Sequence, residues 1–395
     1  MNRFSFIISS LLFTLAMSAQ TPQGPFEQGL KERVVLRTDD VVFRQIDAHT
    51  WYGTGHVMAN ETVYLLEGKK RAMLIDCGTV MHDLDKIVAK LTRKPVSLFL
   101  THAHPDHAGM AINYYKDVYL NAADTIGMQE FAPHYQGQMH FLRDGEIIDL
   151  GGRKIQVVFT PAHTPGSTTF IDLDRQIGFS GDSFGNGNLL LTGTFPTLRA
   201  TAEKMAEYMK KHHITQLWNG HYFGGNTESL KRVADEVTIS DDALSGKITP
   251  TGKMMMDYDE LGLYHCIDTL GVKINFSKGA YYSDDVRKKG IDEALRFLNG
   301  CKKVYVAAIL DNKPMLTTDV RFKASESDLC LSVAPESELS SAVATNQNAG
   351  ILATDDAGRT LKVSCRLVKD NRYPSLAIYK IKEVTATIGG RTILF

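Results

Sequence analysis

Short apolar runs bounded by polar turns recur through roughly the first half of the chain. Thr62 to Leu66 and Arg71 to Asp76 are two such runs, and the Glu67-Gly68-Lys69-Lys70 turn between them predicts a β-hairpin. Val96 to Leu100 is mostly apolar, which is typical of a strand buried on both faces. Further short strands are predicted at 41–46, 118–120, 154–160, 168–172, 177–180 and 216–218.

Apolar residues at helical spacing follow several of these strands. Leu84, Ile87, Val88 and Leu91 share one face of a predicted helix, which Pro95 would stop. A second apolar stripe runs from 198 to 209, and a third helix is predicted from about Glu228 into the 240s. Strands that lead into helices indicate sheets covered by helices, which is a layered α/β architecture.

The last third of the chain has a different pattern. Residues 284–298 predict one helix, whereas 361–367 and 376–388 alternate β-branched and polar residues as strands do. With 395 residues, the chain is long for one core and fits two domains better. We therefore predict a first domain over 30–282 and a smaller, mostly β accessory domain over 283–395, with 246–282 open to either.

The N-terminus indicates export. Arg3 precedes an apolar run from Phe4 to Met17, and small residues follow up to Ala19, which is typical of a secretory signal peptide over 1–19. We expect a periplasmic or secreted protein without a membrane span in the mature chain. The net charge of −1 gives no reason to expect nucleic acid as a partner. The late cysteines are predicted either to form disulfides of open pairing or to remain buried thiols: Cys266, Cys301, Cys330 and Cys365.

The segment Thr101-His102-Ala103-His104-Pro105-Asp106-His107 carries the strongest chemical signal. It follows the apolar strand ending at Leu100. His102 and His104 alternate by two, so an extended backbone points both imidazoles the same way. Asp106 and His107 come after the turn at Pro105 and are free to face a second centre. Imidazole and carboxylate are natural zinc ligands, so this loop predicts a metal site.

Three later residues have the character of further ligands. His163 follows the strand ending at Phe159, Asp182 follows a strand within Ser-Gly-Asp-Ser, and His221 lies in Trp-Asn-Gly-His. Each is a polar residue at a strand end beside Gly or Pro. Ligand sites in layered α/β proteins gather at such ends.

This ordered series resembles the metallo-β-lactamase superfamily of hydrolases over about residues 30 to 245. The resemblance implies an αββα sandwich and two zinc ions, with iron or manganese as alternatives. It places one ion on His102, His104 and His163 and the other on Asp106, His107 and His221. Asp182 would bridge the two ions, and Asp106 and Asp182 would be the catalytic carboxylates. The position of Asp76 resembles the family's early Asp, which helps to hold the metal loop.

The resemblance also limits the chemistry. Zinc β-lactamases usually lack an Asp at the bridging position, so Asp182 favours the hydroxyacylglutathione hydrolase-like branch. We expect an enzyme, a metal-dependent hydrolase that cleaves an ester, lactone or related bond in a small-molecule substrate. A zinc β-lactamase and a non-catalytic metal-containing binding protein are the alternatives. Flavodiiron proteins share the fold, but they usually carry Glu where this chain has His104. Tyr222, next to His221, is a candidate substrate contact, and the oligomeric state stays open.

Overall fold

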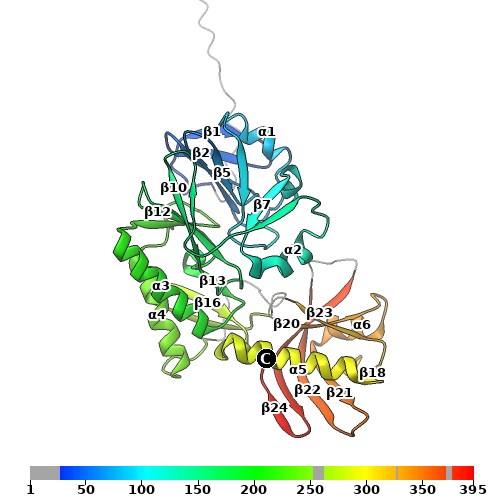
Figure 1. Ribbon diagram of the computed structural model, residues 1–395. Coiled ribbons are helices and arrows are strands. Elements are labelled where there is room, and N and C mark those ends of the chain that lie inside the picture. Colours follow the sequence, from blue (N-terminus) through cyan, green and yellow to red (C-terminus); the bar gives the residue numbers. More distant parts are fainter. Residues whose placement is uncertain (1–26, 252–261, 326–327, 371–375) are drawn as a thin grey trace, which may run out of the picture.

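A computed structural model describes residues 27–251, 262–325, 328–370 and 376–395. The signal peptide predicted at 1–19 lies outside these residues. Within the described residues the chain forms two parts, which are blue to green and yellow to red in Figure 1. None of the helices in the described ranges combines the length and hydropathy that a bilayer span requires.

Two sheets form the frame of the first part. The first sheet contains eight strands in sequential order, antiparallel up to β5 and parallel from β5 to β8. Its strands are β1 (Val34–Arg37), β2 (Val42–Asp47), β3 (Thr50–Thr54), β4 (Thr62–Glu67), β5 (Ala72–Ile75), β6 (Val96–Phe99), β7 (Asp117–Leu120) and β8 (Gln138–Phe141). The second sheet has the order β14-β12-β11-β10-β9. Its strands are β9 (Ile147–Asp149), β10 (Lys154–Phe159), β11 (Thr168–Asp172), β12 (Ile177–Gly181) and β14 (Gln216–Asn219).

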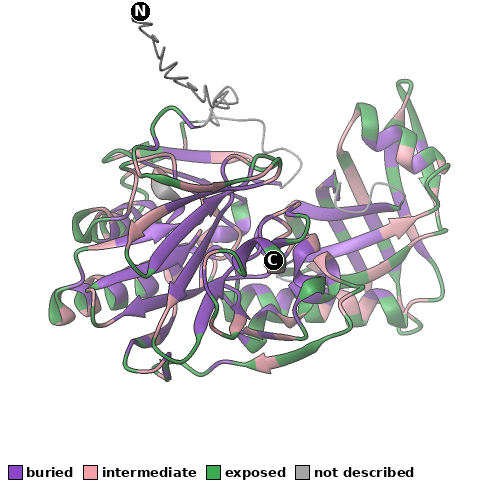
Figure 2. Ribbon diagram, turned by 90° about the horizontal axis from the view of Figure 1, so that it is seen from above, coloured by how far each residue is buried: buried purple, intermediate pink, exposed green. Residues whose placement is uncertain are grey.

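The two sheets pack face to face through alternate residues of their strands. In β4, Tyr64 and Leu66 join Phe170 and Phe179 of the second sheet in one buried cluster. Leu65, one residue away, points to the opposite face of its sheet and packs under α1. Because side chains alternate across a strand, each sheet buries both faces, and Figure 2 shows these strands buried along most of their length.

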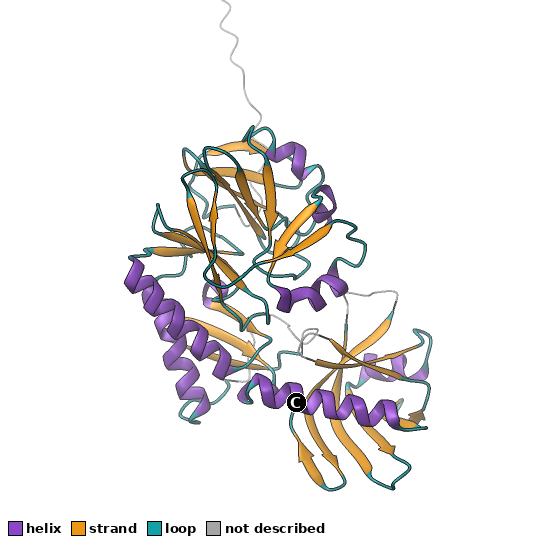
Figure 3. Cartoon of the chain, viewed as in Figure 1, coloured by secondary structure: helices purple, strands orange, loops and turns teal. Residues whose placement is uncertain are grey.

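Helices cover the outer faces of both sheets. The short helices α1 (Leu84–Val88) and α2 (Thr125–Phe131) lie over the first sheet, and α3 (Phe195–His212) and α4 (Leu230–Leu244) lie together against the second (Figure 3). The result is a helix–sheet–sheet–helix sandwich, so the predicted αββα architecture is confirmed.

A third sheet includes part of 246–282, the region that the sequence pattern left open to either domain. It joins β13 (Asn188–Leu191), β16 (Val272–Phe276) and β15 (His265–Thr269) in that order, and β16 runs parallel to β13. Ile267 and Ile274 share a buried cluster with Phe195 of α3. Residues 265–276 therefore pack with the first part of the chain.

The C-terminal part is mostly β, as predicted. Its sheet has the order β18-β17-β21-β22-β23-β20-β19, with β24 on β23, and the helices α5 and α6 pack on it. The strands are β17 (Val304–Leu310), β18 (Lys313–Thr317), β19 (Arg321–Ser325), β20 (Asp328–Val333), β21 (Asn348–Thr354), β22 (Thr360–Lys369), β23 (Ala377–Ile388) and β24 (Arg391–Ile393). The helices are α5 (Asp284–Gly300) and α6 (Glu338–Thr345).

Two expectations change in detail. The helix predicted through Leu91 is shorter, because α1 ends at Val88 and the backbone continues in tight turns up to Thr92. The Thr92 hydroxyl donates to Glu67 and the Thr92 side chain accepts from the Lys94 amide, which fixes that exit before Pro95. All five cysteines are free thiols in the structure, and all but the half-buried Cys301 are buried, as the alternative of buried thiols predicts.

A buried arginine ties the two sheets together at one edge. Arg153, at the start of β10, lies 2.6 Å from the fully buried carboxylate of Asp172 on β11. The same guanidinium donates to Thr50 Oγ1 and to the carbonyl oxygens of His49 and Glu67, in and beside the first sheet. The charge of arginine serves the ion pair with Asp172, and its several N–H donors serve the contacts across the sandwich.

Arg153→Met is therefore expected to destabilise the protein by about 3 kcal/mol, because the buried Asp172 carboxylate loses its nearest cation and keeps only Arg175, at 3.5 Å. Denaturant unfolding monitored by fluorescence measures the loss. Arg143→Met is the matched control: its side chain is 87% exposed beside Glu146, so it should cost less than about 1 kcal/mol. Equal stability of the two variants would contradict this account of how the sheets are held.

Candidate metal centre

The seven residues predicted as metal ligands lie on four loops, and each loop comes directly after a strand of the sandwich. Their loops follow β6, β10, β12 and β14. The structure brings their donor atoms together in two groups, within each of which all donor atoms lie within 4.8 Å of one another. We refer to His102, His104 and His163 as the three-imidazole cluster, and to Asp106, His107, Asp182 and His221 as the four-residue cluster.

Asp182 lies between the two clusters. Its Oδ2 atom is 3.2 Å from His221 Nε2 and 3.7 Å from His163 Nε2. Its Oδ1 atom is 3.6 Å from His107 Nε2. One carboxylate therefore faces imidazoles of both clusters, which is the position that the family resemblance implies for a bridging ligand.

Asp76 determines which nitrogen of two imidazoles faces the site. Its Oδ2 atom accepts from His107 Nδ1 at 2.9 Å and from the Thr101 hydroxyl at 2.7 Å. Because the Thr101 hydroxyl donates its only proton to Asp76, it accepts from His102 Nδ1 at 3.1 Å. Both imidazoles thus turn Nδ1 away from the site and direct Nε2 into it. These hydrogen bonds are the contacts that Asp76 needs for its predicted role, which is to hold the metal loop.

Backbone carbonyls orient two more imidazoles in the same way. His163 Nδ1 donates to the Leu190 carbonyl at 2.8 Å, and His221 Nδ1 donates to the Ala59 carbonyl at 3.1 Å. Their Nε2 atoms then point inward. His104 Nδ1 lies 2.9 Å from His163 Nε2, with its ring edge-on to Phe131.

The pKa shifts differ between the two clusters: His102 and His104 are held neutral, whereas at His107 and His221 the nearby carboxylates outweigh burial and raise the pKa. Burial, with the neighbouring imidazoles, lowers the pKa of His102 and His104 well below the usual value. Burial raises the pKa of Asp182, but His221 and His107 outweigh it and hold the carboxyl well below its usual range. Burial lowers the pKa of His221, yet Asp182 and Asp106 raise it to about 10. The carboxylates therefore attract positive charge into the site.

The donor set fits a divalent transition metal. His102 Nε2 and His107 Nε2 are buried and have no hydrogen-bond partner among the described residues. Burying a nitrogen without a hydrogen-bond partner costs free energy unless something binds it. Imidazole nitrogens are atoms that zinc binds. Imidazole with carboxylate suits zinc, iron and manganese, so the donors by themselves do not choose between these metals.

Gly220 shows how tightly the two clusters pack. A Cβ atom there would lie 2.1 Å from Asp182 Oδ1 and 2.6 Å from His107 Cε1. Any side chain would push a ligand out of position, so only glycine lets β14 deliver His221 this close to Asp182.

Asp124 is a site residue that sequence reasoning missed. It is buried at the start of α2 and links two ligand loops: it accepts from the Ala103 amide, the Thr164 hydroxyl and the Gly166 amide. Ala103 lies between His102 and His104, while Thr164 and Gly166 follow His163. The local sequence around Asp124 carries no motif, and only its place beside these loops reveals the role.

Tyr222 is buried rather than open to the site. Its hydroxyl donates to Glu32 at 2.9 Å and accepts from the Gly225 amide. Its ring meets Tyr52 edge-on in the core between the sheets. These contacts describe a packing residue and leave no free group for the substrate contact that the sequence suggested.

The comparisons agree with this geometry. The family model described as Metallo-beta-lactamase superfamily matches residues 59–221, which contain all seven residues of the two clusters. This part of the chain is a metallo-β-lactamase superfamily domain, as its motifs predict. The expectation of a hydrolase superfamily is likewise confirmed.

Several curated relatives carry enzyme names. Acyl-coenzyme A thioesterase MBLAC2 of Homo sapiens is 24% identical over 213 residues, covering 44% of this chain and 76% of the relative. Hydroxyacylglutathione hydrolase GloC of Haemophilus influenzae is 28% identical over 139 residues, covering 31% and 66%. Probable polyketide biosynthesis zinc-dependent hydrolase BaeB of Bacillus velezensis is 30% identical over 139 residues, covering 33% and 58%. The donor set and the zinc-dependent relative together support a bound metal.

A pH experiment tests the placement of Asp124. Burial raises its pKa from the ordinary 3.8 to about 6 despite three hydrogen bonds. Because the folded pKa exceeds the unfolded one, its favourable effect is present below about pH 4 and is lost as pH rises through 6. Relative to Asp124→Asn, the wild type should lose about 3 kcal/mol of unfolding free energy over this window.

Denaturant unfolding of both proteins between pH 4 and pH 7 provides the comparison, and taking the difference removes the other carboxyl groups. A wild type that gains stability over the variant as pH rises would show that the three donors lower the Asp124 pKa in the folded protein instead.

Proposed function

We propose that this chain is an exported hydrolase that holds two zinc ions and cleaves an ester, lactone or thioester bond of a small molecule. The observation that carries the proposal is the position of Asp182, whose carboxylate faces imidazoles of both clusters at 3.2–3.7 Å. Such an arrangement suits two cations bridged by one carboxylate. The bond type is supported by relatives named as a thioesterase and a hydroxyacylglutathione hydrolase.

In this proposal, His102, His104 and His163 would hold one ion, Asp106, His107 and His221 would hold the other, and Asp182 would serve both. Zinc held there would supply Lewis acidity, which lowers the pKa of water to about 7 and polarises a substrate carbonyl. The protein supplies the orientation: Asp76, Leu190 and Ala59 fix the imidazoles before any substrate arrives.

The two carboxylates are the groups of the chain that reach the reacting water. The side chains of Asp106 and Asp182 are 12% and 15% exposed, so each opens onto the surface of the site. Both are ionised, because the neighbouring imidazoles outweigh the effect of burial and lower their pKa values. An ionised carboxylate accepts a hydrogen bond from the attacking water and aims its lone pair at the carbonyl carbon.

A hydrolysis panel on zinc-loaded protein tests the proposal. The panel holds a lactone, an aryl ester, an acyl thioester and a chromogenic cephalosporin. We expect turnover of an ester-type substrate, lost by about 100-fold or more in Asp182→Ala, since losing several kcal/mol of transition-state stabilisation has this effect. Zinc content by elemental analysis accompanies each assay, and a chelator should abolish turnover in the wild type.

Asp144→Ala is a suitable control, because Asp144 lies on the surface and pairs with Lys204. Turnover of the cephalosporin alone would favour a zinc β-lactamase. Two bound ions with no turnover of any substrate in the panel would instead favour the non-catalytic alternative.

Export is the second element of the proposal, and it rests on the sequence of the first 19 residues. Expression of the full chain in a bacterium with a periplasm should yield a protein whose N-terminus begins near Gln20. Mass spectrometry of the periplasmic fraction measures it. Retention of residues 1–19 in a cytoplasmic product would exclude the export that we propose.

A further inference from the structure

Arg287 reaches from the C-terminal part into the first part of the chain. It lies in the first turn of α5 and is only 4% exposed. Its Nη1 atom donates to the carbonyl oxygens of Thr192 at 3.1 Å and Gly193 at 3.3 Å. Both acceptors directly follow β13, and we call the end of that strand together with these two residues the 190–193 segment.

The 190–193 segment holds His163 at both its ring and its backbone. The Leu190 carbonyl accepts from His163 Nδ1 at 2.8 Å, and the Thr192 hydroxyl donates to the His163 carbonyl. The Gly193 amide donates to the Ala162 carbonyl at 2.8 Å. A shift of this segment would therefore move the His163 imidazole, whose Nε2 atom lies 2.9 Å from His104 Nδ1.

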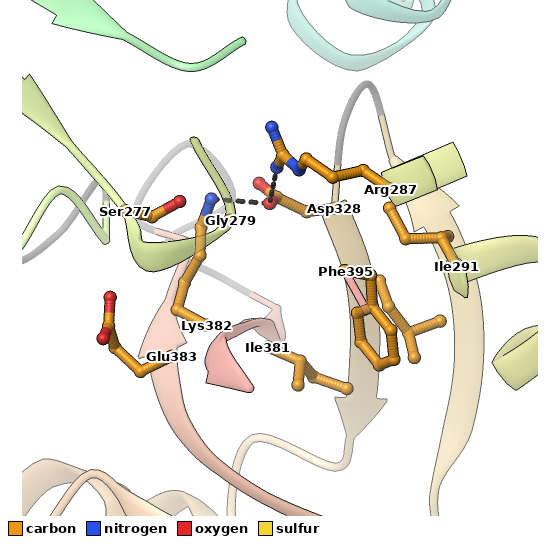
Figure 4. Close-up of a pocket in the computed structure, with 10 residues that line it drawn as sticks. Ser277, Gly279, Arg287, Ile291, Asp328, Ile381, Lys382, Glu383 and Phe395 are labelled. Carbon is orange, nitrogen blue, oxygen red and sulfur yellow. Dashed lines mark hydrogen bonds and ion pairs between the residues drawn. The ribbon is translucent and has the colours of Figure 1, made fainter. Parts of the chain in front are cut away.

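A buried carboxylate anchors Arg287 from the other side. Asp328, at the start of β20, lies 2.5 Å from Lys382 Nζ and 3.8 Å from Arg287 Nη2. Figure 4 shows the Asp328 carboxylate between the two cations. Burial raises the pKa of Asp328, but Lys382, Lys380 and Arg287 outweigh it and hold the carboxyl below its usual value. The anchor stays ionised, so the guanidinium cannot swing away without losing a charge partner.

A second contact links the C-terminal part to the three-imidazole cluster, on the side of His104. Ser325, at the end of β19, donates its buried hydroxyl to Glu130 of α2. The next residue, Phe131, meets the His104 ring edge-on at 5.6 Å between centroids. In Figure 1, α2 is the helix of the first part that faces the C-terminal sheet. The C-terminal part thus contacts the supports of both His104 and His163.

The four-residue cluster is held from within the first part. Asp76 orients His107, and the Ala59 carbonyl orients His221. Asp76 also orients His102 through Thr101, but His104 and His163 have further supports that the C-terminal part contacts.

We infer that Arg287 is a positioning residue for the three-imidazole cluster, through which the C-terminal part sets the place of His163. The accessory region is then a structural component of one half of the metal centre. The inference rests on the proposed function for the nature of the bound ions, and the experiment below separates the two.

The test is metal binding to Arg287→Met, measured as stepwise Zn²⁺ affinity in competition with a chromophoric chelator and as Co²⁺ absorption. Loss of a residue that orients a ligand lowers metal affinity about 10–100-fold. We expect about tenfold weaker binding of one ion with an altered Co²⁺ spectrum, and unchanged binding of the other. His163→Ala identifies which step belongs to the three-imidazole cluster, and Arg287→Lys should recover part of the loss.

Two controls exclude trivial explanations. Lys289→Met removes an exposed charge from the same helix. Leu298→Ala opens the core of the C-terminal part at the far end of α5, so it lowers stability without touching the 190–193 segment. Both should bind two ions as the wild type does.

The outcomes separate the two ideas. Wild-type affinities in Arg287→Met, or an equal loss in Leu298→Ala, would overturn the positioning role while leaving the proposed function intact. A wild type that binds no ion, or a His163→Ala variant that binds both ions normally, would overturn the proposed function and the inference with it.

Discussion

The structure of the site depends on one constraint, which is that several imidazoles must present an unprotonated nitrogen to a shared centre. A neutral imidazole carries one proton, and that proton must be held on the far side of the ring. In four of the five imidazoles, the far nitrogen donates to a fixed acceptor: Thr101, Asp76, Leu190 or Ala59. Burial assists by lowering the pKa of His102 and His104, which keeps their lone pairs free.

Those acceptors come from distant parts of the chain, so the constraint needs the whole sandwich. Asp76 follows β5, Ala59 lies between β3 and β4, and Leu190 belongs to the third sheet. Each sheet brings its strand ends to the same edge, where the loops meet. Asp124 then joins the loop of His102 and His104 to the loop of His163 through three hydrogen bonds. The rigid frame therefore positions the ligand loops before metal binds.

From the sequence alone, the side chains that lie at strand ends could be predicted as parts of the site. The seven donors could be predicted because each is a polar residue directly after an apolar run. The pattern of strands and helices predicted a layered α/β architecture, and the family resemblance supplied the αββα sandwich. The roles of the Leu190 and Ala59 carbonyls could not be predicted, because every residue has a backbone carbonyl and the residue type does not mark the ones that accept from a ligand. Asp124 has no local motif, and the pairing of β16 with β13 joins residues 85 positions apart, such as Asn188 and Lys273.

The contacts of Arg287 show how a second domain can help to position a metal ligand without contacting it. A charge in the C-terminal part costs little to bury only while its partner remains, and Asp328 provides that partner. The same guanidinium then has donors left for the carbonyls of Thr192 and Gly193. Because a planar guanidinium donates in several fixed directions, it can join an anion on one side to a backbone segment on the other. The position of His163 thus follows from the packing of both parts.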